Sequence, residues 1–160
     1  MKVVIGADHG GFDLKGPIIE QLKALGHTHL DVGTHSPDPV DFPDLAREVA
    51  EAILDGRAEL GILLCGSGIG GSIAVNKFPG IRAGLCHDTY SAHQSREHND
   101  ANVLCLGARV IGRELARDIV DTWLKARFDG LPSHQKRIDK IAGIEKEYCS
   151  TPPGMKASQK

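Results

Sequence analysis

The stretch "LLCGSGIGGS", residues 63–72, contains the turn on which the fold of this chain depends. An apolar run ends at Cys65 and passes directly into glycines, a pattern that predicts a buried strand leading into the start of a helix. Gly66, Gly68 and Gly71 also match G-x-G-x-x-G, the fingerprint of dinucleotide-binding loops. Two interpretations follow: the loop holds a cofactor, or it is a catalytic site with Cys65 at its mouth.

Outward from this loop, short apolar runs alternate with stretches of helical periodicity. Alternating strands and helices predict a parallel sheet covered on both faces, and near-continuous apolar strands are typical of such sheets. The predicted fold is therefore α/β, a Rossmann-like three-layer αβα sandwich with a five-stranded parallel sheet. Strands are predicted over residues 2–7, 27–33, 59–65, 81–86 and 102–107, and helices over 11–26, 42–56, 70–80, 89–98, 112–128 and 134–148.

Length and composition narrow the class of protein. A chain of 160 residues favours one domain, which we expect over residues 1–149, with a flexible Pro-, Ser- and Lys-rich tail over 150–160. The net charge of −2 gives no indication that the chain binds nucleic acid or a membrane surface. The longest apolar run is too short to span a bilayer, and the amino-terminal residues lack the pattern of a signal peptide. We expect a cytoplasmic protein.

Four cysteines are present, and none belongs to a C-x-x-C pair, so the spacing of a zinc ribbon is absent and no metal is predicted. Cys86 and Cys105 lie inside apolar runs, where a thiol is most simply a small buried hydrophobic side chain. Cys149 has no assigned role.

The dinucleotide interpretation of the glycine loop has support and two difficulties. Asp88 follows the next strand, near the place where an acidic residue would bind a ribose hydroxyl. However, the helix between Gly70 and Phe78 is barely two turns long, which is short for a Rossmann crossover. The fingerprint also normally follows the first strand of its unit, and here it follows the third.

The catalytic interpretation uses the same backbone geometry. Small residues after a strand let several N–H groups converge on one point, which suits a developing oxyanion. Oriented amides also stabilise a thiolate, so Cys65 can act as a general base, while the Ser67 hydroxyl can bond substrate oxygens. The alternative is that Cys65 is a buried strand-end thiol and Ser67 a turn residue. The loop alone does not decide between the two.

Polar residues at the other strand ends bear on this choice, because ligands of open parallel sheets collect at the carboxyl ends of the strands. Each of these residues, taken alone, is also compatible with an ordinary surface position. Asp8 and His9 follow the first strand, Arg109 follows the fifth, His98 and Asn99 precede the last strand, and Arg137 lies in the last helix.

Four segments carry a family resemblance: "GADHGGFDLK" (6–15), "CGSGIGGSIAVNKFPGIRA" (65–83), "SREHNDANVLCLGARVIG" (95–112) and "HQKRI" (134–138). Together they resemble the type B ribose-5-phosphate isomerases, a family that includes the galactose-6-phosphate isomerase subunits. The similarity runs from about residue 2 to residue 146. It implies an aldose–ketose isomerase that interconverts D-ribose 5-phosphate and D-ribulose 5-phosphate without a metal or organic cofactor.

The resemblance also implies residue roles. Cys65 is similar to the family's proton acceptor, which works through a cis-enediolate. Some members instead carry a glutamate a few residues later, but "SIAVNK" (72–77) holds no carboxylate. The backbone amides of Gly66, Ser67, Gly68, Ile69 and Gly70 would hold the oxyanion, and Ser67 stands where many members have threonine.

The remaining implied roles concern ring opening and substrate binding. His98 resembles the acid that opens the furanose ring, with Asp8 as its helper. Asn99 would bond the sugar chain, and His9, Arg109 and Arg137 would bind the phosphate. In the family the site is shared across a homodimer interface, so we expect a homodimer whose substrate is a small phosphorylated sugar.

One departure from the family pattern leaves the identity of the sugar substrate undecided. Before "HQKR" many members read "GGRH", whereas this chain reads "DGLPSH", with Ser133 at or near the position of a phosphate-binding arginine. We expect Ser133 to cap the last helix. The alternatives are the same reaction on a four-carbon or six-carbon sugar phosphate (erythrose 4-phosphate, allose 6-phosphate or galactose 6-phosphate), a nucleotide-binding module, or a non-catalytic subunit.

Overall fold

Five parallel strands form one sheet in the order β2-β1-β3-β5-β4. The computed structural model describes residues 1–149, so the predicted tail 150–160 lies outside the described residues. The strands are β1 (Lys2–Ala7), β2 (Thr28–Asp31), β3 (Leu60–Cys65), β4 (Ala83–Leu85) and β5 (Val103–Gly107). The helices are α1 (Phe12–Ala24), α2 (Phe42–Leu54), α3 (Ile69–Val75), α4 (Thr89–Glu97), α5 (Arg113–Lys125) and α6 (Pro132–Tyr148). The predicted Rossmann-like α/β fold is confirmed.

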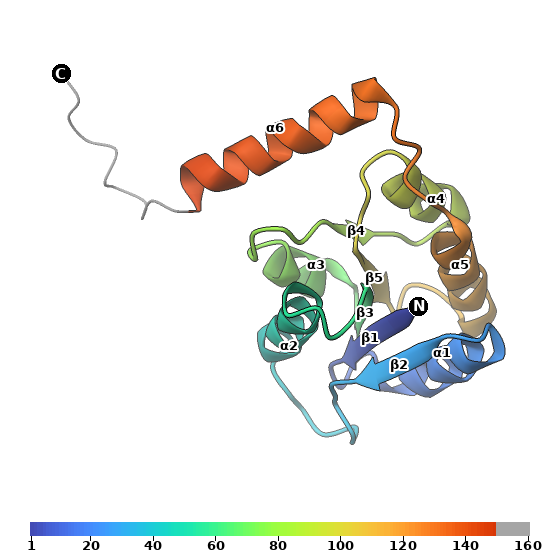
Figure 1. Ribbon diagram of the computed structural model, residues 1–160. Coiled ribbons are helices and arrows are strands. Elements are labelled where there is room, and N and C mark those ends of the chain that lie inside the picture. Colours follow the sequence, from blue (N-terminus) through green and yellow to red (C-terminus); the bar gives the residue numbers. More distant parts are fainter. Residues whose placement is uncertain (150–160) are drawn as a thin grey trace.

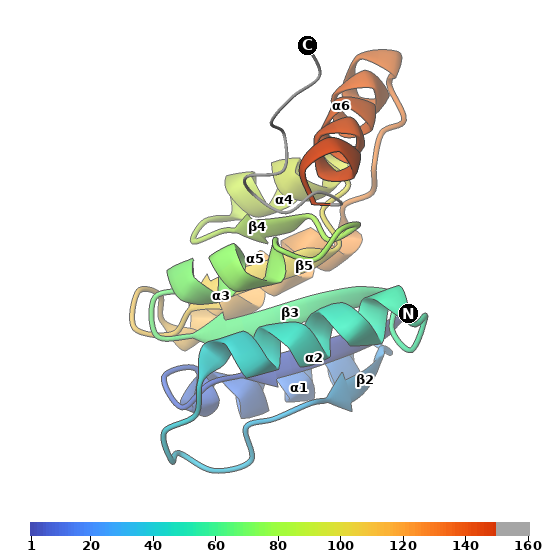
Figure 2. The ribbon, with the colours of Figure 1, turned by 90° about the vertical axis from the view of Figure 1, so that its left-hand side faces the viewer.

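Helices cover both faces of the sheet (Figures 1 and 2). A hydrophobic cluster lies on each face. On β1, Val3 and Ile5 belong to the cluster that packs against α1 and α5, whereas Val4 belongs to the cluster that packs against α2. Successive side chains of a strand point to opposite faces, so a strand covered on both sides must be apolar at every position. This requirement explains the continuous apolar runs from which the strands were predicted.

Several segment ends differ from the sequence expectation: α3 ends at Val75 instead of residue 80, α5 ends at Lys125 instead of residue 128, and β2 covers Thr28–Asp31 of the predicted 27–33. β4 covers only Ala83–Leu85 of the predicted 81–86, because it pairs with β5 alone at the edge of the sheet. α6 begins at Pro132, two residues earlier than predicted, and its N-cap is Leu131. The expectation that Ser133 caps this helix is therefore wrong: proline, whose fixed φ suits the first turn, starts the helix, and Ser133 lies inside it.

Helix α6 extends away from the layered body of the protein (Figures 1 and 2). Its Ile144 side chain is 59% exposed, and Ile141 is also exposed. One link between the helix and the body is the hydrogen bond from Gly80 N–H to Glu145 Oε2, 3.1 Å. Within residues 1–149, no helix has both the length and the apolar character that crossing a bilayer requires.

The interior position of β5, between β3 and β4, generates a stability prediction. Leu104 is fully buried on β5, and its truncation to alanine leaves a cavity, so we expect Leu104→Ala to lower the free energy of unfolding by about 2–5 kcal/mol in urea denaturation. Leu54→Ala is the matched control, because Leu54 is 50% exposed and its loss should cost less than about 0.5 kcal/mol. Equal losses in the two variants would contradict the burial described here.

Candidate active site

The chain leaves β1 for β2 on one side and later returns to β3 on the other, so the β1–β3 pair is the point where strand order reverses. At such a switch point the loops after the two strands diverge to opposite faces and leave a crevice at the carboxyl ends. In this chain the two loops are the one that begins at Asp8 and the one that begins at Gly66. The topology thus brings together two segments that are far apart in sequence.

The two loops are in direct backbone contact. Asp8 N–H donates to Leu64 O at 3.0 Å, and a Cβ added to Gly10 would lie only 2.9 Å from Gly66 N. Glycine at position 10 therefore allows the close approach. The Asp8 side chain is 7% exposed, and its Oδ1 accepts a hydrogen bond from Gly11 N–H at 2.9 Å. One carboxylate oxygen is thus held by its own loop at the edge of the crevice.

Cys65 ends β3, and its side chain turns back under the glycine loop. Its Sγ accepts a hydrogen bond from Gly68 N–H at 3.0 Å, and the residue is 4% exposed. Gly68 has a φ of 78°, and a Cβ there would lie 2.4 Å from Leu85 Cδ1, so both backbone conformation and space require glycine. This amide hydrogen bond fixes the sulfur beside the glycine loop. The geometry suits a base.

Arg109 forms a third side of the crevice. The loop after β5 is joined to the loop after β3 by two hydrogen bonds, from Ala108 N–H to Cys65 O and from Arg109 N–H to Gly66 O, both 2.9 Å. A Cβ on Gly66 would lie 3.5 Å from Arg109 Nε, so the guanidinium group passes close over this glycine. The arginine is exposed and brings a positive charge to the rim, which suits an anionic ligand.

His9 is oriented by the loop that precedes α2. Its Nδ1 accepts a hydrogen bond from Val40 N–H at 3.3 Å. A neutral imidazole that accepts at Nδ1 carries its proton on Nε2, so His9 can donate a hydrogen bond from the other side of its ring. A second hydrogen-bond donor for an anion thus lies at the same rim.

These residues line one cavity of about 340 Å³. The structure therefore gathers seven of the sequence-predicted site residues at one place. The lining consists of Asp8, His9, Gly10, Phe42, Cys65, Gly66, Ser67, Gly70, Arg109 and Val110. Phe42 was not anticipated: its ring packs against Gly70, where a Cβ would lie 2.8 Å from Phe42 Cζ. Two residues of the predicted oxyanion loop do not line this cavity. Gly68 is buried behind the lining, and Ile69 is 54% exposed.

The other predicted site residues lie outside that lining within the described chain. His98 is the C-cap of α4, and Asn99 follows it and lines a different cavity, of about 460 Å³, beneath α6. Arg137 is exposed on α6. In one chain, the predicted site is thus divided into a group around Cys65 and a group around α4 and α6.

His134 lies in the segment "HQKRI" that carried the resemblance, but the sequence alone assigned it no role. It is 9% exposed, its ring stacks on His98 with centroids 4.0 Å apart, and its Nδ1 lies 2.8 Å from Asp129 Oδ2. Burial acts to raise the pKa of Asp129, but hydrogen bonds from Leu131 N–H and His134 outweigh it and hold the pKa below its usual value. No local pattern signals this contact, because the end of α4 and the start of α6 meet only in the tertiary structure.

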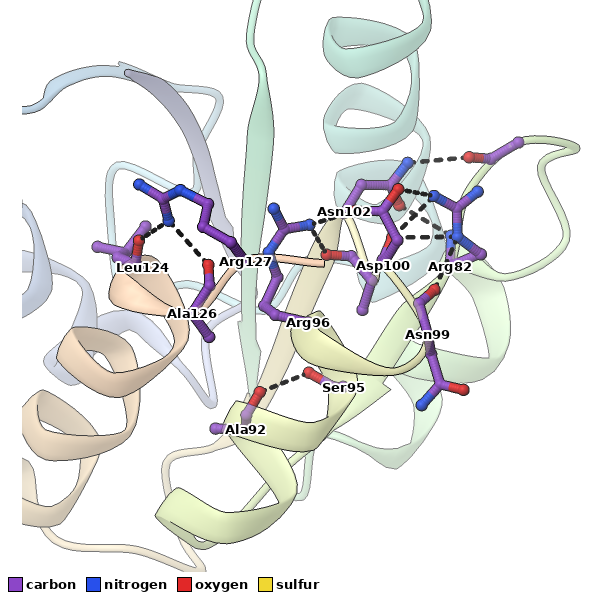
Figure 3. Close-up of polar contacts among 12 residues, drawn as sticks. Arg82, Ala92, Ser95, Arg96, Asn99, Asp100, Asn102, Leu124, Ala126 and Arg127 are labelled. Atoms are coloured by element: carbon purple, nitrogen blue, oxygen red, sulfur yellow. Dashed lines mark hydrogen bonds and ion pairs between the residues drawn. The ribbon is translucent and has the colours of Figure 1, made fainter. Parts of the chain in front are cut away.

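The turn after α4 is held by two arginines around Asp100 (Figure 3). Asp100 has a φ of 44°, and its carboxylate accepts hydrogen bonds from Arg82 Nη2 at 2.8 Å and Arg96 Nη1 at 3.1 Å. Arg82 Nε also donates to Asn99 O at 3.0 Å. These bonds fix the backbone that carries His98 and Asn99.

Arg96 is the more buried of these two arginines. Burial lowers its pKa below the ordinary value, and the charge of Asp100 partly offsets the effect. The guanidinium carbon lies 5.6 Å from the centroid of the Trp123 ring, a cation–π contact. Removing the carboxylate would therefore leave a poorly solvated charge without its partner.

Cys86 and Cys105 are buried, as the sequence predicted. Burial raises the pKa of the Cys86 thiol to about 11 and also raises the pKa of the fully buried Cys105 thiol. Both therefore stay protonated at neutral pH, and neither is available as a base. Among the described cysteines, Cys65 combines a place in the crevice lining with an amide donor to its sulfur.

Comparison with known proteins identifies the family. The sequence pattern of the Ribose/Galactose Isomerase family matches residues 3–141. Ribose-5-phosphate isomerase B of Escherichia coli is 49% identical over 144 residues, which cover 90% of this chain and 96% of that protein. D-erythrulose-4-phosphate isomerase of Pectobacterium atrosepticum is 48% identical, with 91% of this chain and 95% of that protein covered.

Among solved structures, ribose-5-phosphate isomerase B of Clostridium thermocellum superposes with a TM-score of 0.91 at 55% identity, covering 92% of this chain and 99% of that one. The crevice at the switch point thus lies in a Rossmann-like α/β fold shared with sugar-phosphate isomerases. The chain belongs to the ribose/galactose isomerase family. The resemblance stated from the sequence is confirmed.

The arginine pair around Asp100 generates a prediction. Asn also favours a left-handed backbone conformation, so Asp100→Asn removes the charge and keeps the turn. We expect the free energy of unfolding to fall by about 1–3 kcal/mol in urea denaturation, since Arg96 loses its carboxylate. Asp121→Asn, which removes the exposed ion pair with Lys125, should cost less than about 1 kcal/mol. If Asp100→Asn cost no more than this control, the arginine pair would have no stabilising role.

Proposed function

We propose that this chain interconverts D-ribose 5-phosphate and D-ribulose 5-phosphate through a cis-enediolate, without a metal or organic cofactor. The main support is the Cys65 thiol, which accepts a hydrogen bond from Gly68 N–H at the mouth of a glycine loop. The chain that holds this thiol belongs to an isomerase family. Asp8, His9 and Arg109 line the same crevice. A base, an oxyanion cradle and a grip for phosphate are the three parts that this reaction needs.

The first step opens the sugar ring. His98 donates a proton to the ring oxygen as the bond from C1 to that oxygen breaks. Asp8 takes the proton of the C1 hydroxyl, and C1 becomes an aldehyde. The free oxygen of Asp8 suits this role, because its other oxygen is already held by Gly11 N–H. Ring opening exposes the C2 proton to the base.

The second step moves the proton. The Cys65 thiolate removes the C2 proton, the electron pair forms a C1=C2 double bond, and negative charge develops on O1. The amides of residues 66–70 stabilise that charge, and the Ser67 hydroxyl relays the proton from O2 to O1. Cys65 then returns a proton to C1, and C2 becomes the ketone. Amides fixed before the reaction cost no reorganisation as the charge forms.

The phosphate provides binding energy away from the reacting carbons. His9 donates from Nε2, and Arg109 contributes its guanidinium at the rim of the crevice. Arg137 is a further phosphate ligand, and Asn99 bonds the hydroxyls of the sugar chain. These two residues lie outside the lining of the Cys65 crevice in one chain, so their roles require a second copy.

A homodimer with a shared site meets this requirement. The projecting helix α6 carries exposed apolar side chains, Ile141 and Ile144, which a partner chain would cover. Docking of α6 on a second copy would bring the group that includes His98 to the crevice of the partner. We further propose that residues 1–149 form a single domain and that the enzyme is cytoplasmic.

The same reaction on another sugar phosphate is the second candidate. Ser133, inside the first turn of α6, brings no positive charge where many relatives have arginine. A relative 48% identical to this chain is named for D-erythrulose 4-phosphate. A weaker phosphate grip would change the preferred chain length of the sugar and leave the proton transfer unaltered.

The deciding experiment is steady-state kinetics of the purified chain on ribose 5-phosphate, erythrose 4-phosphate, allose 6-phosphate and galactose 6-phosphate. The proposal expects the highest kcat/KM on ribose 5-phosphate. A higher value on a four- or six-carbon sugar would select the second candidate. Activity on none of them would contradict both, and titration with NAD or NADP would then test the nucleotide-binding alternative.

The base assignment generates a prediction for Cys65→Ala. Loss of the thiol removes general-base catalysis, so kcat on the best substrate should fall by about 10²–10⁴-fold while the circular dichroism spectrum stays unchanged. Cys149→Ala is the matched control, because Cys149 is exposed and should not affect turnover. Near-wild-type turnover of every sugar phosphate by Cys65→Ala would rule out the base role.

The ring-opening assignment generates a prediction for His98→Asn. The substitution should slow turnover of ribose 5-phosphate by about 10²-fold or more, because a cyclic substrate needs an acid. Erythrose 4-phosphate carries its phosphate on O4 and cannot close a furanose ring, so its turnover should fall far less. The measurement is the ratio of kcat values for the two substrates. A ratio equal to that of the wild type would remove the ring-opening role.

A further inference from the structure

Three potential metal ligands converge where α4 ends and α6 begins. His134 Nδ1 lies 2.8 Å from Asp129 Oδ2 and 3.0 Å from Asp129 Oδ1, and the His134 ring stacks on that of His98. Ligand atoms of all three residues lie within 4.8 Å of one another. Asp129 and His134 are five residues apart around the start of α6, whereas His98 ends α4, so the tertiary structure brings His98 to the other two.

The spacing is close to that of a bound ion. Bonds of about 2.0–2.2 Å from zinc to nitrogen or oxygen place tetrahedral ligands roughly 3.4 Å apart. The side chains of His134 and Asp129 are 11% and 21% exposed, so they form the fixed part of the site. That of His98 is 36% exposed and stacked on His134, so the His98 ring turns when both imidazoles direct a nitrogen at one ion. Its exposure also leaves a coordination position open to solvent.

The donor set selects the class of metal. Two imidazole nitrogens and one carboxylate suit Zn²⁺, Co²⁺, Ni²⁺ and Cu²⁺, whereas Mg²⁺ and Ca²⁺ prefer oxygen ligands alone. Acidic side chains surround the site: Asp129 contributes a ligand oxygen, and Glu97 Oε2 lies 3.5 Å from His98 Nε2. A metal ion would replace the proton that Nδ1 of His134 shares with Asp129.

We propose that His98, Asp129 and His134 form an inhibitory binding site for a borderline divalent transition-metal ion, of which Zn²⁺ is the physiological example. The ion takes the imidazole nitrogen with which His98 would protonate the ring oxygen, so a metal-bound chain cannot open the sugar ring. The inhibition rests on the proposed function of His98. The binding itself does not, since it follows from the three ligands alone.

The test of binding uses Co²⁺, titrated into the full chain in the presence of a phosphine reductant. We expect saturation at one Co²⁺ per chain, visible d–d absorption, no thiolate-to-cobalt charge-transfer band, and displacement by Zn²⁺. Asp129→Asn and His98→Asn should each weaken binding by about 10-fold or more, as loss of one of three ligands requires. His93→Gln is the matched control, because His93 contacts Glu97 but lies outside the ligand set, and its affinity should be unchanged.

The proposal fails if neither Asp129→Asn nor His98→Asn changes the Co²⁺ affinity. It also fails if a charge-transfer band appears and is lost in Cys65→Ser, which would assign the ion to the catalytic thiol. Two variants are used so that the proposal can still be judged if one of them does not fold. Circular dichroism checks the folding of each. In activity assays, Zn²⁺ should inhibit the wild type reversibly with EDTA, and the inhibition constant should rise in Asp129→Asn by the same factor as the dissociation constant. Binding without inhibition would overturn the inhibitory role alone, because the acid role of His98 is tested independently by the kcat ratio of His98→Asn.

Discussion

The pairing of β1 with β3 is the constraint on which the candidate site depends. These strands run parallel, with Val3 opposite Leu60 and Ala7 opposite Leu64, so their carboxyl ends finish at the same edge of the sheet. The loops that follow must pass within van der Waals distance of each other, which Gly10 permits at Gly66. Only after this approach do Asp8 and Cys65 face one cavity. The chemistry of the crevice therefore follows from the packing of two backbones.

Electrostatics divides the polar residues of the chain into two groups with different physical characters. Around Cys65 the donors are mostly backbone amides and charges at the rim, which suits a transient anion. Around His98 the interactions join buried or half-buried side chains, with Asp129 bound to His134 and Asp100 held between two arginines. Such networks stabilise one arrangement, because breaking one leaves a charge with poor solvation. The first group is built to receive charge and the second to hold a geometry.

Much of the first group could be predicted from sequence. The strands were recognised from continuous apolar runs, and parallel strands place their following residues at a common edge. Asp8 directly follows β1, Cys65 ends β3 and Arg109 lies two residues after β5, so their convergence required only the topology. The second group could not be predicted in the same way. The stacking of His134 on His98 depends on the path of residues 126–131 between α5 and α6, and the start of α6 was itself misplaced by two residues.

By itself, the sequence determined the α/β class, the carboxyl ends of β1, β3 and β5, and the identity of Cys65 as the thiol beside a glycine loop. It could do so because periodicity, glycine and the order of strands and helices are local properties of the chain. The tertiary structure alone decided that Gly68 N–H meets the sulfur, that Phe42 closes the crevice, and that His98, Asp129 and His134 share one cluster. The contacts of Phe42 with Gly70 and of His98 with His134 join segments separated by tens of residues, and even the short contact between Cys65 and Gly68 depends on a backbone conformation that the sequence pattern does not specify.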